Sequence, residues 1–484
     1  MAGIGFQLKH LFKDNSFLGK IRAFTFSSIV IAGPMVLCIT LMTLSEYVLE
    51  LMDTPYYEKE MFLGGTLYSF VFSQLLTGGF TMLLSRYLAD QIYQEQQDNI
   101  LSSLYGILAI NLMLGGAAGI IFYSFSPLPI FFKIFSYVFY IELIIIWLLS
   151  IYISAIKKYL QIIVGFSVGA AISSLLILLG FTWLGINSST GIFICLDIGF
   201  FVIVMYFFKS IKEHFPKNNL RYFDFLTYLE KYPSLFLVGL FYSLGLYGHS
   251  FIVWGGDLKT IISSTFVMAP IYDTPVFYAY LTILPAIVMF VVAVETSFYD
   301  EYKNYYSLIL GQSSLNDIKD AQAKMFSILS REFAWIMEFQ LFFTICSIAI
   351  GTKLLPLSTD QVDIFNIITV GNYFFIMMFI IIQILLYFDD RKGAAFVITS
   401  YCLANILLTI ITSKIETYGL SCFLAGFIGL VLALKRISYY SKNFNYYTFC
   451  SLPIMVKQEK LFITKVVQKL NLLNGVGGSY ETKE

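Results

Sequence analysis

The chain has 484 residues, of which 58% are hydrophobic, 18% are aromatic and only 13% are Lys, Arg, Asp or Glu. Lys plus Arg and Asp plus Glu both number 31, so the formal net charge is zero. This composition excludes a disordered chain and a disulfide scaffold. It also argues against a soluble enzyme, because 48 Phe and 34 Tyr exceed what a water-facing surface can hide. We therefore expect a polytopic membrane protein.

Twelve stretches are long and apolar enough to cross a bilayer, which needs about 20 residues per helix. They are residues 23–46, 62–84, 100–124, 134–156, 160–183, 190–208, 233–255, 275–294, 333–352, 364–388, 394–412 and 418–434. Very short connections join the fifth to the sixth and the eleventh to the twelfth. Because bare backbone cannot lie in lipid, these connections predict helix hairpins.

The distribution of Lys and Arg predicts the orientation. If the N-terminus is cytoplasmic, 26 of the 31 basic residues lie on the inner side. The other five lie in separate outer loops and are Lys59, Lys133, Lys259, Lys353 and Lys414. This bias follows the positive-inside rule and predicts that both termini are cytoplasmic. The first 20 residues are charged and lack a long apolar run, so we expect no cleavable signal peptide.

A cytoplasmic connection separates six spans from six, which predicts two bundles that enter the membrane in the same orientation. The predicted parts are an amphipathic N-terminal segment 1–22, a first six-helix bundle 23–208, a linker 209–232, a second six-helix bundle 233–435 and a cytoplasmic tail 436–484. In the second bundle, the later half of the inner segment 295–332 is expected to form a cytosolic helix that runs into the ninth span.

Two segments at the inner surface are amphipathic. One is 4–13. In the tail, one helix face carries Phe462, Ile463, Val466, Val467, Leu470 and Leu473, and the other carries Lys457, Lys460, Lys465 and Lys469. An apolar face opposite a basic face predicts a helix in the interface of an anionic leaflet. Docking of a cytosolic partner is the alternative.

Ionisable residues within spans are costly, so each is a functional candidate. The deep ones are Glu142, Asp197, His249 and Glu338, and Glu295 lies at the inner end of the eighth span. Since no deep Lys or Arg offsets the acids, they must be protonated, hydrogen-bonded or face a water-filled cavity. This pattern favours a transporter that binds protons, a cation or sugars, although a structural hydrogen bond explains each acid equally well.

Other residues give weaker signals. The amides of Gln74 and Asn111 suit sugar hydroxyls, but they also suit contacts between helices. Gly33-Pro34 in the first span and Pro285 in the eighth predict breaks or close packing.

Enzyme signatures are scarce. The chain has no GxxxxGK[ST] motif and no paired-His metal spacing, so we expect neither a nucleotide-driven motor nor a metal or other cofactor. Two enzyme classes stay open: a membrane glycosyltransferase that uses Glu46, Glu50 and Asp53, and a membrane acyltransferase that uses His249.

Four segments, MAGIGFQLKHLF, SSIVIAGPMVL, SRYLADQIY and YDTPVFYAYLTILPAIVMFVVAVETSFYDEYKNYY, resemble the PelG family of Pel exopolysaccharide transporters. That family is similar to the multidrug/oligosaccharidyl-lipid/polysaccharide flippase superfamily, with twelve spans in two six-helix bundles around a central cavity. The resemblance therefore implies an all-α, MATE-like fold. It also implies that the protein moves the growing Pel polymer, rich in N-acetylgalactosamine and galactosamine, across the cytoplasmic membrane of a bacterium.

The resemblance further implies partners, namely the cytosolic Pel glycosyltransferase and the other membrane subunits of the Pel synthase complex; no nucleic acid is expected. Arg22, Arg86, Asp90 and Glu295 are carried over as members of matching motifs, although topology anchoring explains their place at inner helix ends as well. The energy source stays open between polymer elongation and ion coupling. The alternatives within transport are a lipid-linked oligosaccharide flippase and a MATE-type drug antiporter.

Overall fold

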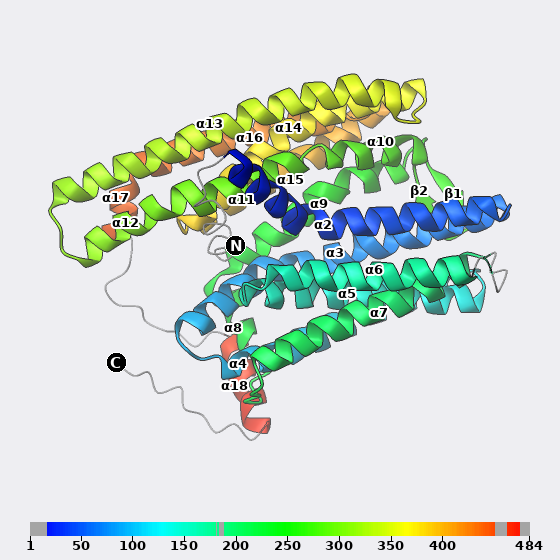
Figure 1. Cartoon of the computed structure of the whole chain (residues 1–484), viewed down its shortest axis with the longest axis horizontal. Helices are drawn as coiled ribbons and strands as arrows, with labels where there is room; N and C mark the ends of the chain where they lie inside the picture. Colours follow the sequence, from blue (N-terminus) through cyan, green and yellow to red (C-terminus); the bar gives the residue numbers. More distant parts are fainter. Residues whose placement is uncertain (1–16, 181, 183–187, 451–461, 475–484) are drawn as a thin grey trace. The chain divides into compact units, whose positions relative to one another are not determined.

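The computed structural model describes residues 17–180, 182, 188–450 and 462–474, and most of them lie in long helices (Figure 1). The predicted amphipathic segment 4–13 lies outside this part of the chain. Up to Trp254 the elements are α2 (Phe17–Leu51), α3 (Tyr56–Tyr93), α4 (Asp98–Ser124), α5 (Ile130–Ala155), α6 (Tyr159–Leu179), α7 (Ser189–His214), η2 (Asp224–Leu226), α8 (Thr227–Lys231) and α9 (Pro233–Trp254).

After Trp254 the chain forms a short hairpin and further helices. Its elements are β1 (Thr260–Ile262), β2 (Phe266–Met268), α10 (Pro270–Leu281), α11 (Leu284–Ala293), η3 (Val294–Phe298), α12 (Tyr299–Leu310), α13 (Leu315–Leu354), α14 (Thr359–Tyr387), α15 (Arg391–Lys414), α16 (Leu420–Lys442), α17 (Phe444–Phe449) and α18 (Phe462–Leu473). Over the residues described, 12 spans are long and apolar enough to cross a membrane, with α10 and α11 together forming the eighth. The predicted count is confirmed.

The described chain forms two compact units. The first bundle comprises Pro34–Tyr247, the hairpin Thr260–Met268 and α18; the second bundle comprises α2 up to Gly33, Gly248–Lys259 and the chain from Ala269 to residue 450. The chain thus passes between the units within α2 and within α9, which are the first spans of the two halves.

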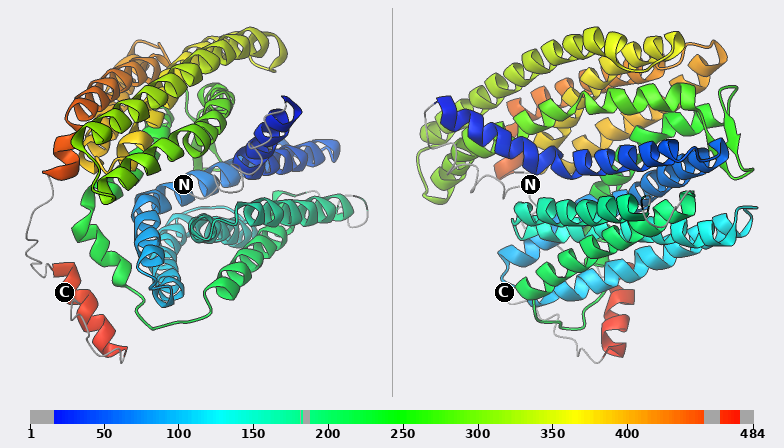
Figure 2. Two further views of the ribbon diagram at one scale, coloured as in Figure 1. Left: turned by 60° about the vertical axis from the view of Figure 1, so that its left-hand side comes forward. Right: turned by 45° about the vertical axis from the view of Figure 1, so that its right-hand side comes forward.

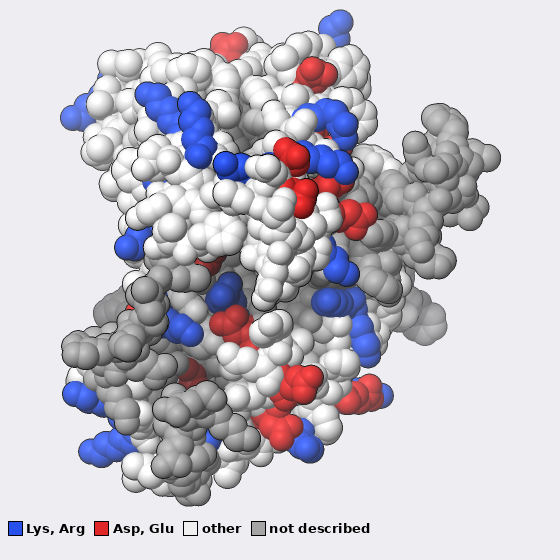
Figure 3. Space-filling view, turned by 90° about the vertical axis from the view of Figure 1, so that its left-hand side faces the viewer, with Lys and Arg blue, Asp and Glu red and all other residues white. Residues whose placement is uncertain are grey.

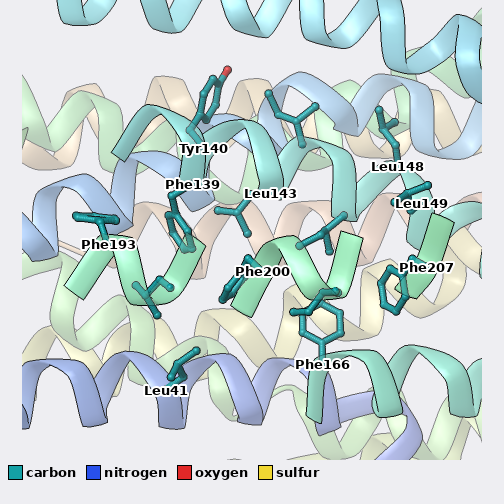
Figure 4. Packing of buried hydrophobic residues seen from close by; sticks show 14 of the residues in the cluster. Leu41, Phe139, Tyr140, Leu143, Leu148, Leu149, Phe166, Phe193, Phe200 and Phe207 are labelled. Atoms are coloured by element: carbon teal, nitrogen blue, oxygen red, sulfur yellow. The ribbon is translucent and has the colours of Figure 1, made fainter. Parts of the chain in front are cut away.

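The core of the first bundle is aromatic, and it includes the contact between α5 and α7 (Figure 4). Phe139 on α5 contacts Phe193 and Phe200 on α7, with ring centroids 5.7 and 5.0 Å away. The two α7 rings are two helical turns apart and so lie on one side of that helix. Tyr140 points to the other side of α5, away from Phe139.

Glycines bring helix backbones of the first bundle together at two crossings. A Cβ on Gly239 of α9 would lie 2.2 Å from the carbonyl oxygen of Gly78 on α3. A Cβ on Gly199 of α7 would lie 2.5 Å from the carbonyl oxygen of Gly169 on α6. No larger residue fits at these distances. Close packing, which small residues permit between membrane helices, therefore explains these glycines.

In the second bundle α14 is the most enclosed helix. It packs against α10, α13, α15 and α16, and 72% of the residues in its apolar 18-residue stretch are buried. A Cβ on Gly371 would lie 2.8 Å from the backbone nitrogen of Phe423 on α16, so the two helices approach closely there. Phe375 on α14 contacts Tyr401 on α15, with ring centroids 5.2 Å apart.

Of the two predicted breaks, one is confirmed and the other is wrong. The eighth span breaks between Leu281 and Leu284, and Pro285 lies in the first turn of α11, where its missing N–H is not needed. By contrast, α2 stays helical through Pro34. A single proline within a membrane helix removes one backbone hydrogen bond, and the flanking turns can continue the helix.

The predicted helix that runs without a break into the ninth span is confirmed, because α13 is one helix of 40 residues; its place in the cytosol stays a prediction. Its start is fixed by Ser314, whose hydroxyl accepts a hydrogen bond from the backbone nitrogen of Asp317 at 3.2 Å.

Figure 3 faces the end of the molecule that carries α12 and α17, and charged side chains of both signs are spread over it.

Candidate functional site

Two of the predicted acids, Glu142 on α5 and Asp197 on α7, are buried in the first bundle, with exposed fractions of 6% and 7%. Glu142 is one turn from Phe139, and Asp197 is one turn from Phe193, so both lie near the packed faces of these helices. Asp197 is within electrostatic range of Glu142. The structure therefore brings together two acids that are 55 positions apart in the sequence.

These carboxylates lack partners. Oε2 of Glu142 and both side-chain oxygens of Asp197 have no hydrogen-bond partner, and no ion pair among the residues described includes either group. Buried polar groups are normally satisfied, so an orphaned pair is a candidate site for a proton or a cation.

The two predicted amides of the first bundle behave differently. Asn111 on α4 is fully buried; its Nδ2 donates to the carbonyl oxygen of Ile107 at 3.1 Å, and its Oδ1 has no partner. Gln74 on α3 accepts a hydrogen bond from the hydroxyl of Tyr247 on α9. Gln74 thus joins two helices, and Asn111 keeps one unused acceptor.

A recess with a volume of about 200 Å³ lies between α3, α4 and α5 of the first bundle. Aromatic rings dominate its wall, and Ser69, Ala118 and Gly119 lie between them. The lining residues are Tyr68, Ser69, Phe72, Ala118, Gly119, Phe122, Tyr123 and Tyr140. Sequence reasoning missed this site, because its residues come from three helices and none of them is ionised at neutral pH.

The hairpin β1–β2 holds one wall of this recess in place. The hydroxyl of Tyr68 donates to the carbonyl oxygen of Val267 and accepts from its backbone nitrogen, both at 2.9 Å. Phe266 is fully buried against Gly64, where a Cβ would lie 2.8 Å from its ring. The hairpin was not predicted, although the β-branched and aromatic residues on both sides of Ser263-Ser264 are a strand signal.

His249 lies fully buried in the second bundle between two tyrosines of α10. Its Nε2 is 3.0 Å from the hydroxyl of Tyr280, and its Nδ1 is 2.9 Å from that of Tyr272. A neutral imidazole has one donor and one acceptor nitrogen, and two hydroxyls can satisfy both. Tyr272 and Tyr280 are about two turns apart, so they lie on the same side of α10. This spacing is visible in the sequence and could have indicated a pair of tyrosines that faces one partner.

In the second bundle, the amide of Gln340 forms a hydrogen bond at the break in the eighth span. Gln340 on α13 is fully buried, and its Nε2 donates to the carbonyl oxygen of Thr282 at 2.8 Å. Thr282 lies between α10 and α11, where the helical hydrogen bonds are interrupted. The neighbouring helix thus satisfies a carbonyl group that the break would leave without a partner.

The other predicted site residues are dispersed. Glu338 is exposed on α13, next to the exposed ring of Phe339, and not in the packed interior. Glu295 falls in the π-turn η3 and Arg22 in α2, but the side chains of both lie outside those the structure describes. A transport role for these three residues stays a prediction.

Arg86 and Asp90, one turn apart on α3, join this helix to α8. Arg86 Nε lies 3.2 Å from Asp90 Oδ1, and its guanidinium lies 5.5 Å from the ring centre of Tyr232. The hydroxyl of Tyr228 donates to Asp90 Oδ2 at 3.0 Å. Both motif residues therefore fix the linker between the sixth and seventh spans.

A family model described as "PelG: Putative exopolysaccharide Exporter (EPS-E)" matches residues 1–449. The chain belongs to the PelG exopolysaccharide exporter family. The predicted resemblance is confirmed, and the family is described as one of exporters. A search of curated proteins by sequence gave no match.

Solved structures agree with the PelG assignment at the level of fold. The chain is similar to a MOP superfamily transporter from Pyrococcus furiosus, with a TM-score of 0.55 and 13% identity over 87% of this chain and 96% of that one. It is also similar to the Vibrio cholerae MATE transporter VcmN in its bent form, with a TM-score of 0.58 and 11% identity over 92% and 100% of the two chains.

A third similar structure is an outward-facing multidrug resistance MATE family transporter, with a TM-score of 0.57 and 11% identity over 88% of this chain and 97% of that one. At such identities the likeness shows the fold alone. The predicted all-α, MATE-like fold is therefore confirmed, and the chain is a multi-pass membrane transporter of the PelG family.

Proposed function

We propose that this chain moves the Pel polymer, rich in N-acetylgalactosamine and galactosamine, across the cytoplasmic membrane of a bacterium. The observation that carries the proposal is the PelG family match over residues 1–449. The chain acts as the membrane subunit of a synthase complex, its partners are the cytosolic Pel glycosyltransferase and the other membrane subunits, and both termini lie in the cytoplasm. It transports the polymer and forms no glycosidic bond itself.

Two details support transport over the enzyme alternatives. Both ring nitrogens of His249 face tyrosine hydroxyls, so the imidazole is not directed at a substrate as an acyltransferase base would be. Glu46 and Glu50 belong to the helix α2 and only Asp53 follows it, so two of the three acids that a glycosyltransferase would use lie on a spanning helix and not on an outer loop.

The test uses inverted membrane vesicles that contain this chain and the cytosolic glycosyltransferase, supplied with the activated sugar. We expect newly made polymer inside the vesicles, where an added glycoside hydrolase cannot reach it. Vesicles without this chain serve as the control, and their polymer should be degraded. Polymer that stays degradable with the chain present contradicts the proposal. Turnover of the activated sugar by the purified chain alone supports an enzyme instead.

The aromatic recess is where we place one sugar unit of the polymer. Its volume of about 200 Å³ is below the roughly 300–1,000 Å³ of pockets for drug-sized ligands, as a site for a single ring would be. Aromatic rings offer flat apolar surface to the C–H face of a sugar, and the hydroxyl of Tyr140 adds a polar edge.

Filling the recess is expected to reduce export about tenfold. This is the lower end of the effects that one added or missing methylene group has in a fitted pocket. Ala118 lines the recess and is exposed, so Ala118→Leu adds volume there without displacing a core side chain. Its neighbour Ala117 is also exposed but does not line the recess, which makes Ala117→Leu the matched control. Equal export by the two variants, at equal protein levels in the membrane, contradicts the assignment of the recess.

A further inference from the structure

The tail helix α18 is attached to the linker of the first bundle through its N-terminus. Glu230 on α8 accepts hydrogen bonds from the backbone nitrogens of Ile463 and Thr464 at 2.5 and 3.0 Å, and from the Thr464 hydroxyl at 2.6 Å. The first N–H groups of a helix have no partner within the helix, and a carboxylate there is also favoured by the helix dipole.

Glu230 is charged while it makes these contacts. Desolvation raises the pKa of Glu230, but the hydrogen bonds from Thr464 and Ile463 together outweigh it, so the pKa lies below its ordinary value. The attachment is therefore complete at neutral pH and is lost only as the pH falls through that lowered pKa.

A second set of contacts fixes one face of α18. Nδ2 of Asn471 donates to Oδ1 of Asp224 at 2.7 Å, Asn474 donates to the carbonyl oxygen of Leu220 at 3.3 Å, and Val467 is fully buried. Val467 and Asn471 are one turn apart, so they define the face of α18 that meets η2 and α8.

The opposite face of α18 has no cover from the described part of the chain. Phe462 and Leu473 are 79% and 76% exposed, and Val466 between them is 40% exposed. Lys465 and Lys469 are exposed alongside this stripe. The linker therefore covers only part of the apolar surface predicted for this helix. Val467 packs against the linker, while Phe462, Val466 and Leu473 remain exposed.

The direction of α18 indicates what covers the stripe. In Figures 1 and 2, α18 lies across the direction of the first bundle's spans, close to the end where α4 begins. A helix in this position has its axis along the plane of the membrane surface. Exposed apolar side chains with lysines beside them fit the boundary between anionic headgroups and acyl chains.

We propose that the exposed face of α18, formed by Phe462, Val466, Leu473, Lys465 and Lys469, binds the anionic surface of the membrane, and that Glu230 holds the helix there. The tail thereby ties the linker between the two halves to the lipid. This inference is independent of the cargo that the chain transports.

The experiment uses the full chain in lipid nanodiscs, with a fluorophore on a cysteine that replaces Phe462. Cys450, which is exposed, is replaced by serine so that it is not labelled. One set of discs contains phosphatidylcholine alone, and the other also contains phosphatidylglycerol; both carry a quencher on the acyl chain. A label at Gln97, exposed in the turn before α4, is the matched control outside α18.

We expect strong quenching at position 462 only in discs with phosphatidylglycerol, and its loss in high salt, which screens exposed charges. Lys465→Gln and Lys469→Gln should each lower the partition of α18 into the lipid about fivefold. Equal quenching in both lipids, or none in either, overturns the proposal. Shielding of position 462 by added glycosyltransferase in the absence of lipid quenching also overturns it and identifies a protein partner instead.

Discussion

Polymer export is expected to fall about tenfold when Asp197 is replaced by asparagine or Glu142 by glutamine. A factor of this size is near the lower end of what is usual when binding at one site is coupled to binding at another. Both carboxyl groups are buried, and both oxygens of Asp197 lack a hydrogen-bond partner. An amide keeps the size of the side chain but cannot take up and release a proton or hold a cation. A carboxyl group that changes its charge during transport therefore loses that step.

The double variant separates a coupled pair from two independent groups. If Glu142 and Asp197 act as one site, the double variant exports about as much polymer as the worse single variant, because groups that act as a unit are not additive. Exported polymer is measured per amount of chain in the membrane. Glu50→Gln, at an exposed position near the end of α2, is the matched control. Full output from each of the three single variants Glu142→Gln, Asp197→Asn and Glu338→Gln would remove the idea of an acidic path.

Replacing Arg436 by leucine is expected to lower the free energy of unfolding of the second bundle by about 3 kcal/mol. Arg436 on α16 makes a two-pronged contact with Asp390, through Nε at 2.6 Å and Nη2 at 2.7 Å. The Asp390 side chain is only 6% exposed. Without its partner, this carboxylate would be a buried and unpaired charge, which is more costly than the loss of an attractive contact.

Asp390 also accepts a hydrogen bond from the backbone nitrogen of Gly393 at 3.1 Å and so caps α15. Adding Asp390→Asn to Arg436→Leu should recover much of the stability, because asparagine removes the charge and keeps an acceptor for the cap. Arg331→Leu, which removes an exposed ion pair with Glu332, should change the stability by less than about 1 kcal/mol. Denaturant titrations in detergent measure all three. A loss for Arg436→Leu no larger than for Arg331→Leu would contradict the argument.

Features that depend on a short stretch of sequence were predictable. The twelve spans follow from runs of apolar residues, because a helix must bury all its own backbone polar groups in lipid. The break before Pro285 follows from the missing N–H and fixed φ of proline. The same argument failed at Pro34, where α2 continues, because the surrounding turns decide whether a proline ends a helix.

The site residues show where local reasoning stops. Glu142 and Glu338 look alike in the sequence, since each is a single acid within an apolar run. The structure buries Glu142 between packed helices and leaves Glu338 exposed on α13. The face of a helix that packs is set by its neighbours, and a stretch that is apolar all round does not reveal that face.

The sequence by itself determined the class of protein, the number of spans, the long helix α13 and membership of the PelG family, because apolar length and short motifs are properties of neighbouring residues. Tertiary structure alone decided that Glu142 lies within electrostatic range of Asp197, that Tyr68 is held by the hairpin, that two tyrosines enclose His249 and that Glu230 holds α18. Each of these brings together residues that are not neighbours in the sequence, and its geometry depends on how whole helices pack.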